Sequence, residues 1–314
     1  MRIYFTFEPR PDLCESLLAE FPQVHFVFER RLSHEELTQA DVLVTYGEDV
    51  TEEALQYAPN LKWIFVASAG IEKLPAQAIM ERSIIVSNVR GIHKTPMAES
   101  VLAHILALKR AIPWIYEQQQ KSEWSKKAKQ SELYGSTALI LGPGAIGSEI
   151  GRLLQAFGVK TIGCNRSGQT APYMDSMTNF TQLTDVLPQA DIVIAVLPKT
   201  AETTHLLTEV HFRAMKNSAI FMNFGRGNLV EEHVLLHAMK AQEIGYAVLD
   251  VFEQEPLTAD NPLWSLPNVI ISPHISSHSS RYVERSLAIF KPNLAKWLRG
   301  EGDLENLLDL SRGY

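Results

Sequence analysis

The chain has 314 residues, more than one ordinary domain needs and suited to two. Its hydrophobic share of 46% and charged share of 21% are those of a globular protein with a sizeable core, and its net charge of −7 argues against non-specific nucleic-acid binding. The chain has two cysteines, no run that approaches about 18 apolar residues, and a start without the apolar core of a signal peptide. These features predict a cytoplasmic protein with no disulfide framework, no Cys-rich zinc site and no membrane partner.

The first part of the chain, up to about residue 90, alternates short β-rich runs with helical stretches. Two of the stretches between the runs, 12–20 and 51–58, have the apolar spacing of amphipathic helices. Alternating strands and helices predict a parallel sheet that is covered on both faces. The predicted strands are rich in Val, Ile, Phe or Tyr and comprise Arg2–Phe7, Val24–Phe28, Val42–Tyr46, Trp63–Ala67 and Ile84–Ser87.

A long, largely apolar helix is predicted next, over Met97–Ala111. Thr95 precedes it as a cap, Pro96 suits the first helical position, and Glu99 lies in the first turn, where the helix dipole favours an anion. This helix would join two domains, and its apolar character fits either a dimer contact or burial between the domains. The polar stretch Glu117–Ser131 would follow it as a solvated connection.

A second alternating series begins at Thr137 and contains as many predicted strands as a complete dinucleotide-binding sheet. A final helical stretch, Arg281–Leu298, would return to the first domain, and Pro292 is expected to kink or break that helix. We therefore predict an α/β protein with a Rossmann-type doubly wound parallel sheet over 98–279 and a flavodoxin-like substrate domain over 1–97, completed by 280–314. The strands of the second series are Ala138–Leu141, Thr161–Cys164, Ile192–Leu197, Ile220–Phe224, Tyr246–Val251 and Val269–Ser272.

The glycine-rich stretch GPGAIG, residues 142–147, follows an apolar strand and opens the amphipathic stretch AIGSEIGRLLQAFG. In a dinucleotide-binding loop the first glycine permits a tight turn, the second lets the backbone approach a pyrophosphate, and the third allows close helix packing. The amides at the start of the helix and its dipole then favour an anion. A lone glycine motif is a weak signal, and the alternative is a strand-to-helix turn without a ligand. The predicted cofactor contacts here are Gly142, Gly144, Ala145, Ile146 and Gly147.

No acidic residue occurs from Ile150 to Met174, although an NAD-binding loop has an Asp or Glu about 20 residues after the glycines to hold a ribose. The corresponding position reads CNRSG and offers Asn165, Arg166 and Ser167. A carboxylate there would repel a 2′-phosphate, whereas a guanidinium binds it bidentately. We therefore predict NADP(H) as the preferred cofactor and leave NAD(H) open. The alternative is that the arginine is a surface charge stacked on adenine.

Three ionisable residues follow three strands of the second series. Arg226 ends AIFMNFGRG between two glycines, Glu255 lies in LDVFEQEP, and His274 lies in ISPHISS. The carboxyl ends of parallel strands share one edge, where open α/β sheets bind ligands. Any one of the three alone would read as an ordinary loop residue, but together they predict a site for proton transfer.

Reduction of a 2-keto acid requires a hydride donor, a cation that binds the carboxylate and polarises the carbonyl, and a proton for the new alkoxide. Arg226 would be the cation and His274 the proton donor. An imidazole ordinarily titrates near about pH 6.5, so it serves as an acid in one direction and a base in the other. Glu255, hydrogen-bonded to the ring, would favour its protonated form.

The stretches around these three residues read NFGRGNLVEEHVLLHAMKAQEIGYAVLDVFEQEPL, NPLW and PNVIISPHIS. In these stretches the sequence resembles the D-isomer-specific 2-hydroxyacid dehydrogenases. The similarity extends to VASAGIEKLP, VSNVRGIHKTPMAES and VLPKTAETTHLL, and it is strong over residues 62–278. The stretch CNRSG departs from the NAD-using members and is similar to that of the NADPH-using glyoxylate and hydroxypyruvate reductases.

The resemblance implies roles for individual residues. Arg226 would bind substrate, His274 would be the acid and base, and Glu255 would orient the histidine. Backbone amides around Ala69 and Gly70 would bind the substrate carboxylate. Further cofactor contacts would come from Asp250, which would hold the nicotinamide amide, and from Leu197, Pro198, Thr203, Phe224, Gly225 and Ser276.

Two rival interpretations concern metal and function. His233 and His237 are four residues apart on a predicted helix, but HVLLH lacks the Glu of a metalloprotease motif and no third ligand is evident, so we predict no metal site.

A dinucleotide-sensing regulatory scaffold with weak or no catalysis is the rival function, and the lack of long partner-docking tails counts against it. We predict a homodimer that acts on a small 2-keto or 2-hydroxy acid.

Overall fold

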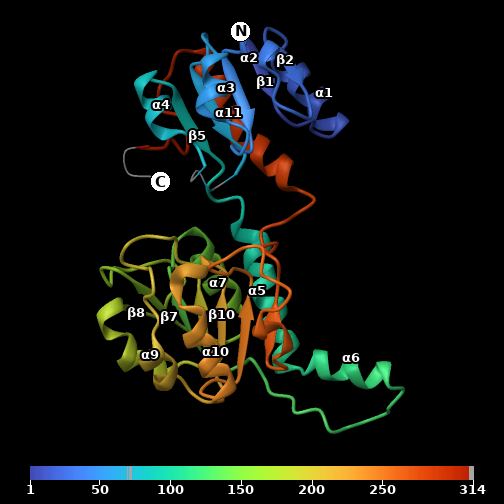
Figure 1. The fold of residues 1–314 in the computed structure, drawn as a ribbon, viewed down its shortest axis with the longest axis vertical. Helices are drawn as coiled ribbons and strands as arrows, with labels where there is room; N and C mark the ends of the chain where they lie inside the picture. The colour runs from blue at the N-terminus through green and yellow to red at the C-terminus, as the bar shows by residue number, and fades with distance from the viewer. Residues whose placement is uncertain (69, 71–72, 311–314) are drawn as a thin grey trace. The chain divides into compact units, whose positions relative to one another are not determined.

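The structure, a computed structural model, describes residues 1–68, 70 and 73–310. It divides into two compact units: unit 1 comprises Met1–Ile92 with Ser279–Tyr314, and unit 2 comprises His93–His278. Figure 1 traces the chain from unit 1 into unit 2 and back again near its end. The sequence placed the two domain boundaries at 97/98 and 279/280.

A five-stranded, all-parallel sheet forms the centre of unit 1, in the order β2-β1-β3-β4-β5. This is the strand order of flavodoxin-like sheets, so the fold class predicted for this part is confirmed. Each predicted strand of the first series is present, with ends shifted by one or two residues. The strands are β1 (Arg2–Phe5), β2 (His25–Phe28), β3 (Val42–Thr45), β4 (Trp63–Val66) and β5 (Ile85–Asn88), and the helices are α1 (Pro11–Glu20), α2 (His34–Leu37), α3 (Glu52–Gln56), α4 (Ala76–Glu81) and α11 (Tyr282–Leu298).

Helix α11 completes the core of unit 1. Leu287, Phe290 and Leu294 are buried against the sheet, and the Phe290 ring centroid lies 5.5 Å from that of Trp63. A kink or a break was expected at Pro292, and the helix is not broken there, because it continues through this residue. A proline inside a helix costs about 3 kcal/mol. Burial of three large apolar side chains, each contributing about 1.5–3 kcal/mol, offsets that cost.

A seven-stranded, all-parallel sheet forms the centre of unit 2, in the order β12-β11-β10-β9-β6-β7-β8. Counted from the β8 edge, the first six strands have the order of a dinucleotide-binding sheet, and β12 follows as a seventh strand. This order confirms the Rossmann-type prediction. The sequence missed β8, because SMTN is a short, polar run at the sheet edge. The strands are β6 (Thr137–Leu141), β7 (Lys160–Asn165), β8 (Ser176–Asn179), β9 (Ile192–Ala195), β10 (Ile220–Asn223), β11 (Tyr246–Leu249) and β12 (Val269–Ile271).

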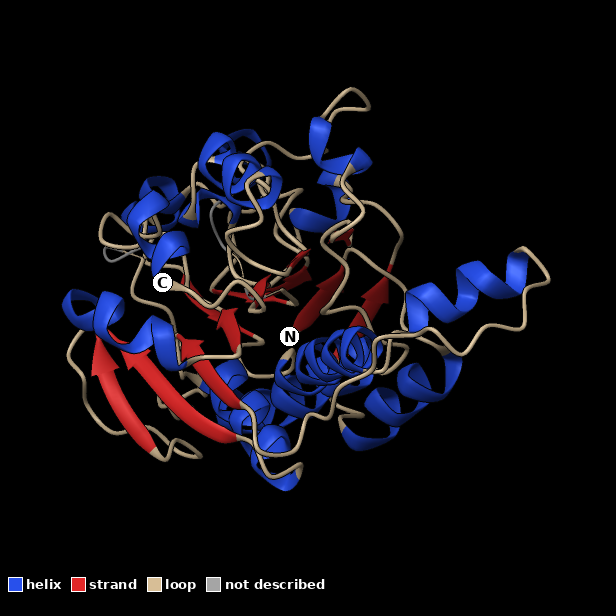
Figure 2. Ribbon diagram, turned by 90° about the horizontal axis from the view of Figure 1, so that it is seen from below, coloured by secondary structure: helices blue, strands red, loops and turns tan. Residues whose placement is uncertain are grey.

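Helices cover both faces of this sheet, as Figure 2 shows. On one face α5 packs against α7, and together they cover Ile140 and Ile194. On the other face α8, α9 and α10 cover Leu139 and Val193. Consecutive residues of one strand thus enter opposite cores, as the period of a strand requires. The helices are α5 (Lys94–Lys109), α6 (Ile112–Gln120), α7 (Ala145–Ala156), α8 (Leu183–Val186), α9 (Glu209–Ala214) and α10 (Glu232–Lys240), with 3₁₀ turns at Phe180–Gln182, Leu187–Gln189, Gly227–Leu229 and Pro262–Ser265.

Helices α5 and α6 differ in part from the prediction. Helix α5 begins at Lys94 rather than Met97, and α6 includes Glu117–Gln120, the start of the stretch predicted as a solvated connection. None of the residues of α6 is buried. Over the described ranges, no helix combines the length and the apolar character that a membrane crossing requires.

Candidate active site

The strands of unit 2 deliver the predicted residues to one edge of the sheet. Because the sheet is all parallel, the carboxyl ends of β6, β7 and β9 to β12 lie at the same edge. Each predicted residue of this unit lies within or a few residues beyond one of those ends. We call this edge the unit 2 rim, and it consists of segments 142–147, 165–167, 197–203, 224–227, 250–255 and 272–276.

The glycine loop has the shape that a pyrophosphate requires. Gly142 has a φ of +92°, in the left-handed region that favours glycine. A Cβ on Gly147 would overlap the carbonyl oxygen of Gly142, so the third glycine brings α7 close to the loop. A Cβ on Gly144, the residue before α7, would meet no other atom, so this backbone is open to a ligand. The amides of the first turn of α7, which begins at Ala145 and Ile146, supply donors for an anion.

A Gly144→Ala variant is expected to fold normally and to bind NADPH at least about tenfold more weakly, because the methyl group would occupy the space that the second glycine leaves for the pyrophosphate. The free energy of unfolding should change by less than about 1 kcal/mol, since the residue only caps a helix. Urea unfolding and a fluorescence titration with NADPH measure the two quantities. Wild-type affinity in a folded variant would argue against a pyrophosphate at this loop.

The segment after β7 presents its polar groups to solvent. The amide of Asn165 donates from Nδ2 to the carbonyl of Gln169, and its Oδ1 accepts from the backbone amide of Ser167 at 3.1 Å. These bonds fix the loop that carries Arg166. The guanidinium of Arg166 lies 3.5 Å from a carboxylate oxygen of Glu202, a residue that the sequence analysis did not single out.

The two rim segments that follow β9 and β10 pack closely against each other. Thr203 is buried, and its hydroxyl donates to the carbonyl of Pro198 at 2.7 Å. A Cβ on Gly225 would crowd the backbone of Leu197, so these two segments touch. Phe224 is buried and meets the ring of His104 on α5 edge to face. The predicted cofactor contacts Leu197, Pro198, Thr203, Phe224 and Gly225 therefore lie together.

Arg226 is held in place through its backbone. The Nδ2 group of Asn223, at the end of β10, donates to the carbonyl of Arg226 at 3.0 Å. The guanidinium Nη1 donates to the carbonyl of Gly225 at 3.0 Å. On the other side, a Cβ on Gly227 would overlap the backbone of Phe252, so the loops after β10 and β11 are in direct contact.

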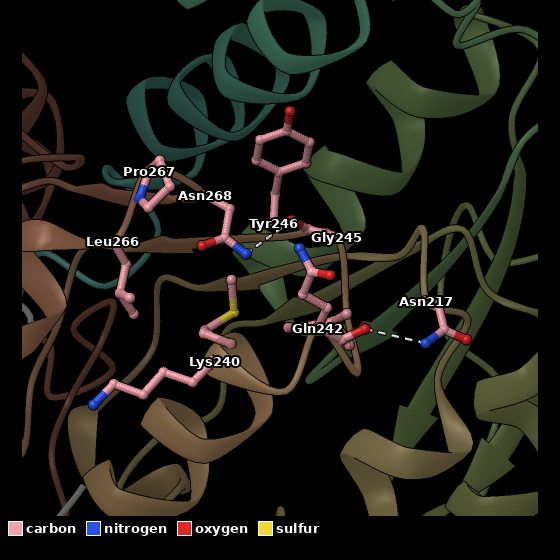
Figure 3. Close-up of a pocket in the computed structure, with 10 residues that line it drawn as sticks. Asn217, Lys240, Gln242, Gly245, Tyr246, Leu266, Pro267 and Asn268 are labelled. Atoms are coloured by element: carbon pink, nitrogen blue, oxygen red, sulfur yellow. Dashed lines mark hydrogen bonds between the residues drawn. The ribbon is translucent and has the colours of Figure 1, made fainter.

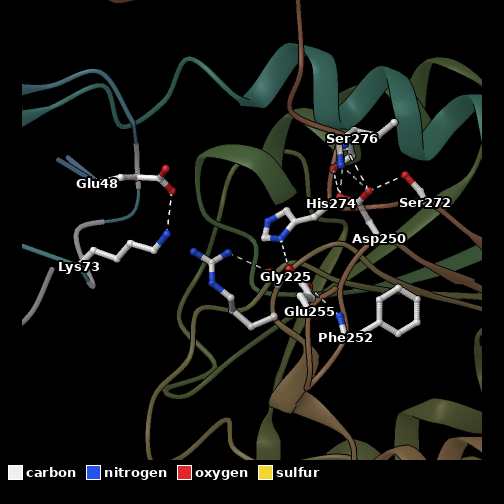
Figure 4. Close-up of polar contacts among 11 residues, drawn as sticks. Glu48, Lys73, Gly225, Asp250, Phe252, Glu255, Ser272, His274 and Ser276 are labelled. Atoms are coloured by element: carbon white, nitrogen blue, oxygen red, sulfur yellow. Dashed lines mark hydrogen bonds and ion pairs between the residues drawn. The ribbon is translucent and has the colours of Figure 1, made fainter. Parts of the chain in front are cut away.

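The structure brings Glu255 and His274 together, as Figure 4 shows. The Nδ1 atom of His274 lies 2.8 Å from Oε2 of Glu255, and Oε1 of Glu255 accepts from the backbone amide of Phe252 at 2.9 Å. The histidine side chain is 46% exposed and the glutamate 35%. The carboxylate thus contacts the ring at Nδ1 rather than at Nε2.

Asp250 anchors the segment that carries His274. This buried carboxylate accepts from the hydroxyls of Ser272 and Ser276, and from the backbone amides of Ile275 and Ser276 (Figure 4). The sequence assigned Asp250 and Ser276 to the cofactor and missed Ser272. In this structure the two serines flank the histidine along the chain, and each of them bonds to the aspartate.

His274 itself has a φ of +56°, in the left-handed region. Such a conformation is uncommon for a residue other than glycine and costs roughly 1–2 kcal/mol. The bonds to Asp250 hold this backbone in place, and the amide of His274 donates to the carbonyl of Ser272 at 3.0 Å. Strain of this kind clusters at functional sites, where the surrounding structure fixes a side chain in one orientation.

His93 is buried, and burial lowers its pKa to about 4 from an ordinary value of 6.5, with the positive charge of Arg226 acting in the same direction. The unfolded chain binds this proton at higher pH than the folded chain. Stability from the neutral ring is therefore complete above about pH 6.5 and is lost as the pH falls towards 4.

We expect the wild-type protein to lose up to about 3 kcal/mol of unfolding free energy at His93 over this window, and a His93→Gln variant to lack that part of the pH dependence. Urea unfolding at roughly equal pH steps from 4.5 to 7.5 measures how the unfolding free energy of both proteins changes with pH. Identical slopes would show that this ring does not titrate with folding.

The predicted substrate contacts of unit 1 follow β4. Ala69 lies outside the described residues, and the carbonyl of Gly70 accepts from the hydroxyl of Ser68 at 2.9 Å. Glu48 and Lys73, also drawn in Figure 4, form an exposed ion pair of 2.8 Å within this unit.

A surface hollow in unit 2 lies away from the rim. It is lined by residues that precede β10, β11 and β12, among them Asn217, Gly245 and Asn268, so it is at the amino ends of these strands (Figure 3). Its side-chain amides bond to backbone carbonyls, from Asn217 to Gln242 and from Asn268 to Gly245. The hollow contains none of the predicted site residues.

The two histidines that suggested a metal do not gather ligands. His233 is exposed and its Nε2 lies 3.7 Å from a carboxylate oxygen of Glu231, two residues earlier in the chain. Within the part of the chain that the structure describes, no group of three or more His, Cys, Asp or Glu side chains is placed to hold a metal ion.

Two curated relatives cover most of this chain. A D-3-phosphoglycerate dehydrogenase of Methanocaldococcus jannaschii is 34% identical over 276 residues, which are 85% of this chain but 51% of that protein, so this chain spans about half of it. A glyoxylate/hydroxypyruvate reductase B of Klebsiella pneumoniae is 33% identical over 85% of this chain and 84% of its own length.

Solved structures and a family model agree with these relatives. A D-isomer specific 2-hydroxyacid dehydrogenase family protein from Aeromonas salmonicida has a TM-score of 0.86 at 35% identity, over 98% of this chain and 99% of its own. An NADPH-dependent glyoxylate/hydroxypyruvate reductase from Sinorhizobium meliloti, solved with NADP and sulfate, has a TM-score of 0.80 at 26% identity, over 100% of this chain and 99% of its own. The model of the D-isomer specific 2-hydroxyacid dehydrogenase NAD-binding domain matches residues 102–276. The chain is therefore an oxidoreductase of the D-isomer specific 2-hydroxyacid dehydrogenase family.

Proposed function

We propose that this protein uses NADPH to reduce a short 2-keto acid to the corresponding D-2-hydroxy acid at the unit 2 rim. The observation that carries the proposal is the 2.8 Å contact between His274 and Glu255, on the rim that also holds the glycine loop and Arg226. A paired imidazole and carboxylate beside a guanidinium form a site that binds a keto acid and protonates its oxygen.

The chain's own groups would divide the work as follows. The guanidinium of Arg226 would bind the substrate carboxylate and polarise the carbonyl. The bound cofactor supplies a hydride to C2 of the substrate. His274 would give the proton on Nε2 to the oxygen that becomes the hydroxyl, and Glu255 holds the ring in position through Nδ1. Because the ring is partly exposed, solvent then restores its proton.

The cofactor would lie along the rim, with its pyrophosphate on the glycine loop. Asp250 and Ser276 would contact the nicotinamide end, although their bonds to each other give them a second role in holding the histidine segment. The remaining contacts proposed for the cofactor are Gly142, Gly144, Ala145, Ile146, Gly147, Asn165, Ser167, Leu197, Pro198, Thr203, Phe224 and Gly225.

A preference for NADP(H) over NAD(H) is supported by Arg166. The segment 165–167 contains no carboxylate that would repel a 2′-phosphate, and the side chain of Arg166 is 79% exposed. The Sinorhizobium meliloti relative, whose structure holds NADP, uses the same fold.

A substrate of the glyoxylate or hydroxypyruvate type is supported by the name of the Klebsiella pneumoniae relative. Steady-state rates with glyoxylate, hydroxypyruvate, pyruvate and bulkier 2-keto acids, each with NADPH and with NADH, test both choices. We expect the highest kcat/KM with NADPH as the cofactor and with either glyoxylate or hydroxypyruvate as the substrate. Tight dinucleotide binding without turnover of any keto acid would instead favour the regulatory scaffold.

We also propose that the protein is a homodimer, in the cytoplasm. The residues Met97, Val101 and Ile105 of α5 are buried in the core of unit 2, so burial within the chain accounts for the apolar character of this helix. Exposed apolar residues occur instead on α6 and after it, at Tyr116 and Trp124 among others, and these support a contact between two copies.

A further inference from the structure

The carboxylate that is missing after β7 has a counterpart from a different strand. Glu202 lies in the segment after β9, and one of its carboxylate oxygens lies 3.5 Å from Nη1 of Arg166. In the sheet, β6 lies between β7 and β9, so the two segments extend from either side of the strand that ends in the glycine loop. The ion pair therefore lies where the adenosine half of a bound dinucleotide would be.

The segment that carries Glu202 is held in one conformation. The hydroxyl of Thr203 accepts from the amide of Thr200 at 2.9 Å and donates to the carbonyl of Pro198, while the amide of Thr204 donates to the carbonyl of Thr200 at 3.0 Å. The segment of Arg166 is fixed by the bonds of Asn165. The two charges thus face each other from two ordered loops.

Glu202 carries its negative charge at neutral pH. Its pKa is lowered, first by a hydrogen bond from its own backbone amide and then by one from the Thr200 hydroxyl, with a smaller contribution from the charge of Arg166. Both partners of the ion pair are more than half exposed, so the pair by itself adds little to stability. Its effect appears when a third charge, a phosphate, approaches the same guanidinium.

We propose that Glu202 determines cofactor specificity: it competes with the 2′-phosphate of NADP(H) for Arg166 and so keeps the enzyme open to NAD(H). An unphosphorylated ribose places no charge at this point and leaves the ion pair intact. A 2′-phosphate must either displace the carboxylate from the guanidinium or accept its repulsion. The inference rests on the proposed dinucleotide site, and it assigns the balance between the two cofactors to one carboxylate.

The test is direct binding of NADPH and of NADH, measured by fluorescence titration at low ionic strength so that turnover is not required. Glu202→Gln keeps the shape of the side chain and removes its charge. We expect the dissociation constant of NADPH to fall roughly three- to tenfold in this variant, as the loss of one nearby like charge in water predicts, while that of NADH changes less than about twofold. The gain should shrink as salt is added.

Two further variants make the outcome specific. In Arg166→Gln, NADPH should bind more weakly, and addition of Glu202→Gln should then give a smaller gain than in the wild-type background, since competition for the guanidinium is absent and only the repulsion between the carboxylate and the phosphate is removed. Glu209→Gln is the matched control, because Glu209 is an exposed carboxylate paired with Arg213 elsewhere in unit 2, and the ratio of the two dissociation constants should stay at the wild-type value.

The results separate this inference from the proposed function. If both dinucleotides bind and Glu202→Gln leaves the ratio of their dissociation constants within about twofold of the wild-type ratio, the role of Glu202 is refuted while the dinucleotide site stands. If neither dinucleotide binds to the wild-type protein, the proposed function fails and this inference fails with it.

Discussion

A His274→Asn variant is expected to reduce the keto acid about 10²- to 10⁴-fold more slowly than the wild-type enzyme, with its NADPH affinity unchanged. The ring is the only group that Glu255 holds towards the substrate in the proposed mechanism, and an asparagine carries no proton to transfer. Asparagine is the suitable replacement because His274 has a φ of +56° and asparagine tolerates that region better than most residues. Stopped-flow mixing of the enzyme–NADPH complex with keto acid isolates the chemical step.

The control for this variant is His233→Asn, at an exposed histidine on α10 whose charged neighbour is Glu231. It should react at the wild-type rate. A comparable decrease in both variants would point to a general effect on folding, and a wild-type rate in His274→Asn would remove the histidine from the mechanism.

A Gly227→Ala variant is expected to lose at least about 3 kcal/mol of unfolding free energy and most of its activity. A Cβ on Gly227 would overlap the backbone carbonyl of Phe252, and no side-chain rotation relieves a clash with backbone. The amide of Phe252 belongs to the same segment as Glu255 and donates to its carboxylate. Any shift that accommodates the methyl group therefore moves Glu255 or the neighbouring Arg226.

Gly302→Ala provides the comparison, because a Cβ there meets no other atom and its backbone is not left-handed. This variant should remain within about 0.5 kcal/mol of the wild-type protein. Urea unfolding of both variants gives the difference. Equal stabilities would mean that the loops after β10 and β11 do not meet as the structure places them.

Much of the architecture was predictable from the sequence, because strands of a buried parallel sheet are short continuous apolar runs. The runs ALIL in β6 and IVIA in β9 are recognisable as strands for this reason. Strand β8 was not predicted, because SMTN is polar and lies at the edge of the sheet. The break predicted at Pro292 did not occur, since the packing of α11 on the aromatic core of unit 1 outweighs the local preference.

The site was predictable only as far as strand order allows. Parallel strands bring their carboxyl ends to one edge, so the presence of Arg226, Glu255 and His274 at the same rim follows from the pattern. Contacts between loops do not follow from it. The bonds of Asp250 to Ser272 and the approach of Glu202 to Arg166 depend on the path of each loop after its strand ends.

The transfer of deuterium from NADPH tests the central claim most directly. The enzyme is given hydroxypyruvate with NADPH that carries deuterium at both C4 positions of the nicotinamide, and the product is examined by mass spectrometry and chiral chromatography. The proposed site predicts glycerate of the D configuration with one deuterium on C2, formed by the wild-type enzyme and not at a comparable rate by His274→Asn. Product without deuterium, product of the L configuration, or undiminished transfer by the variant would contradict the account.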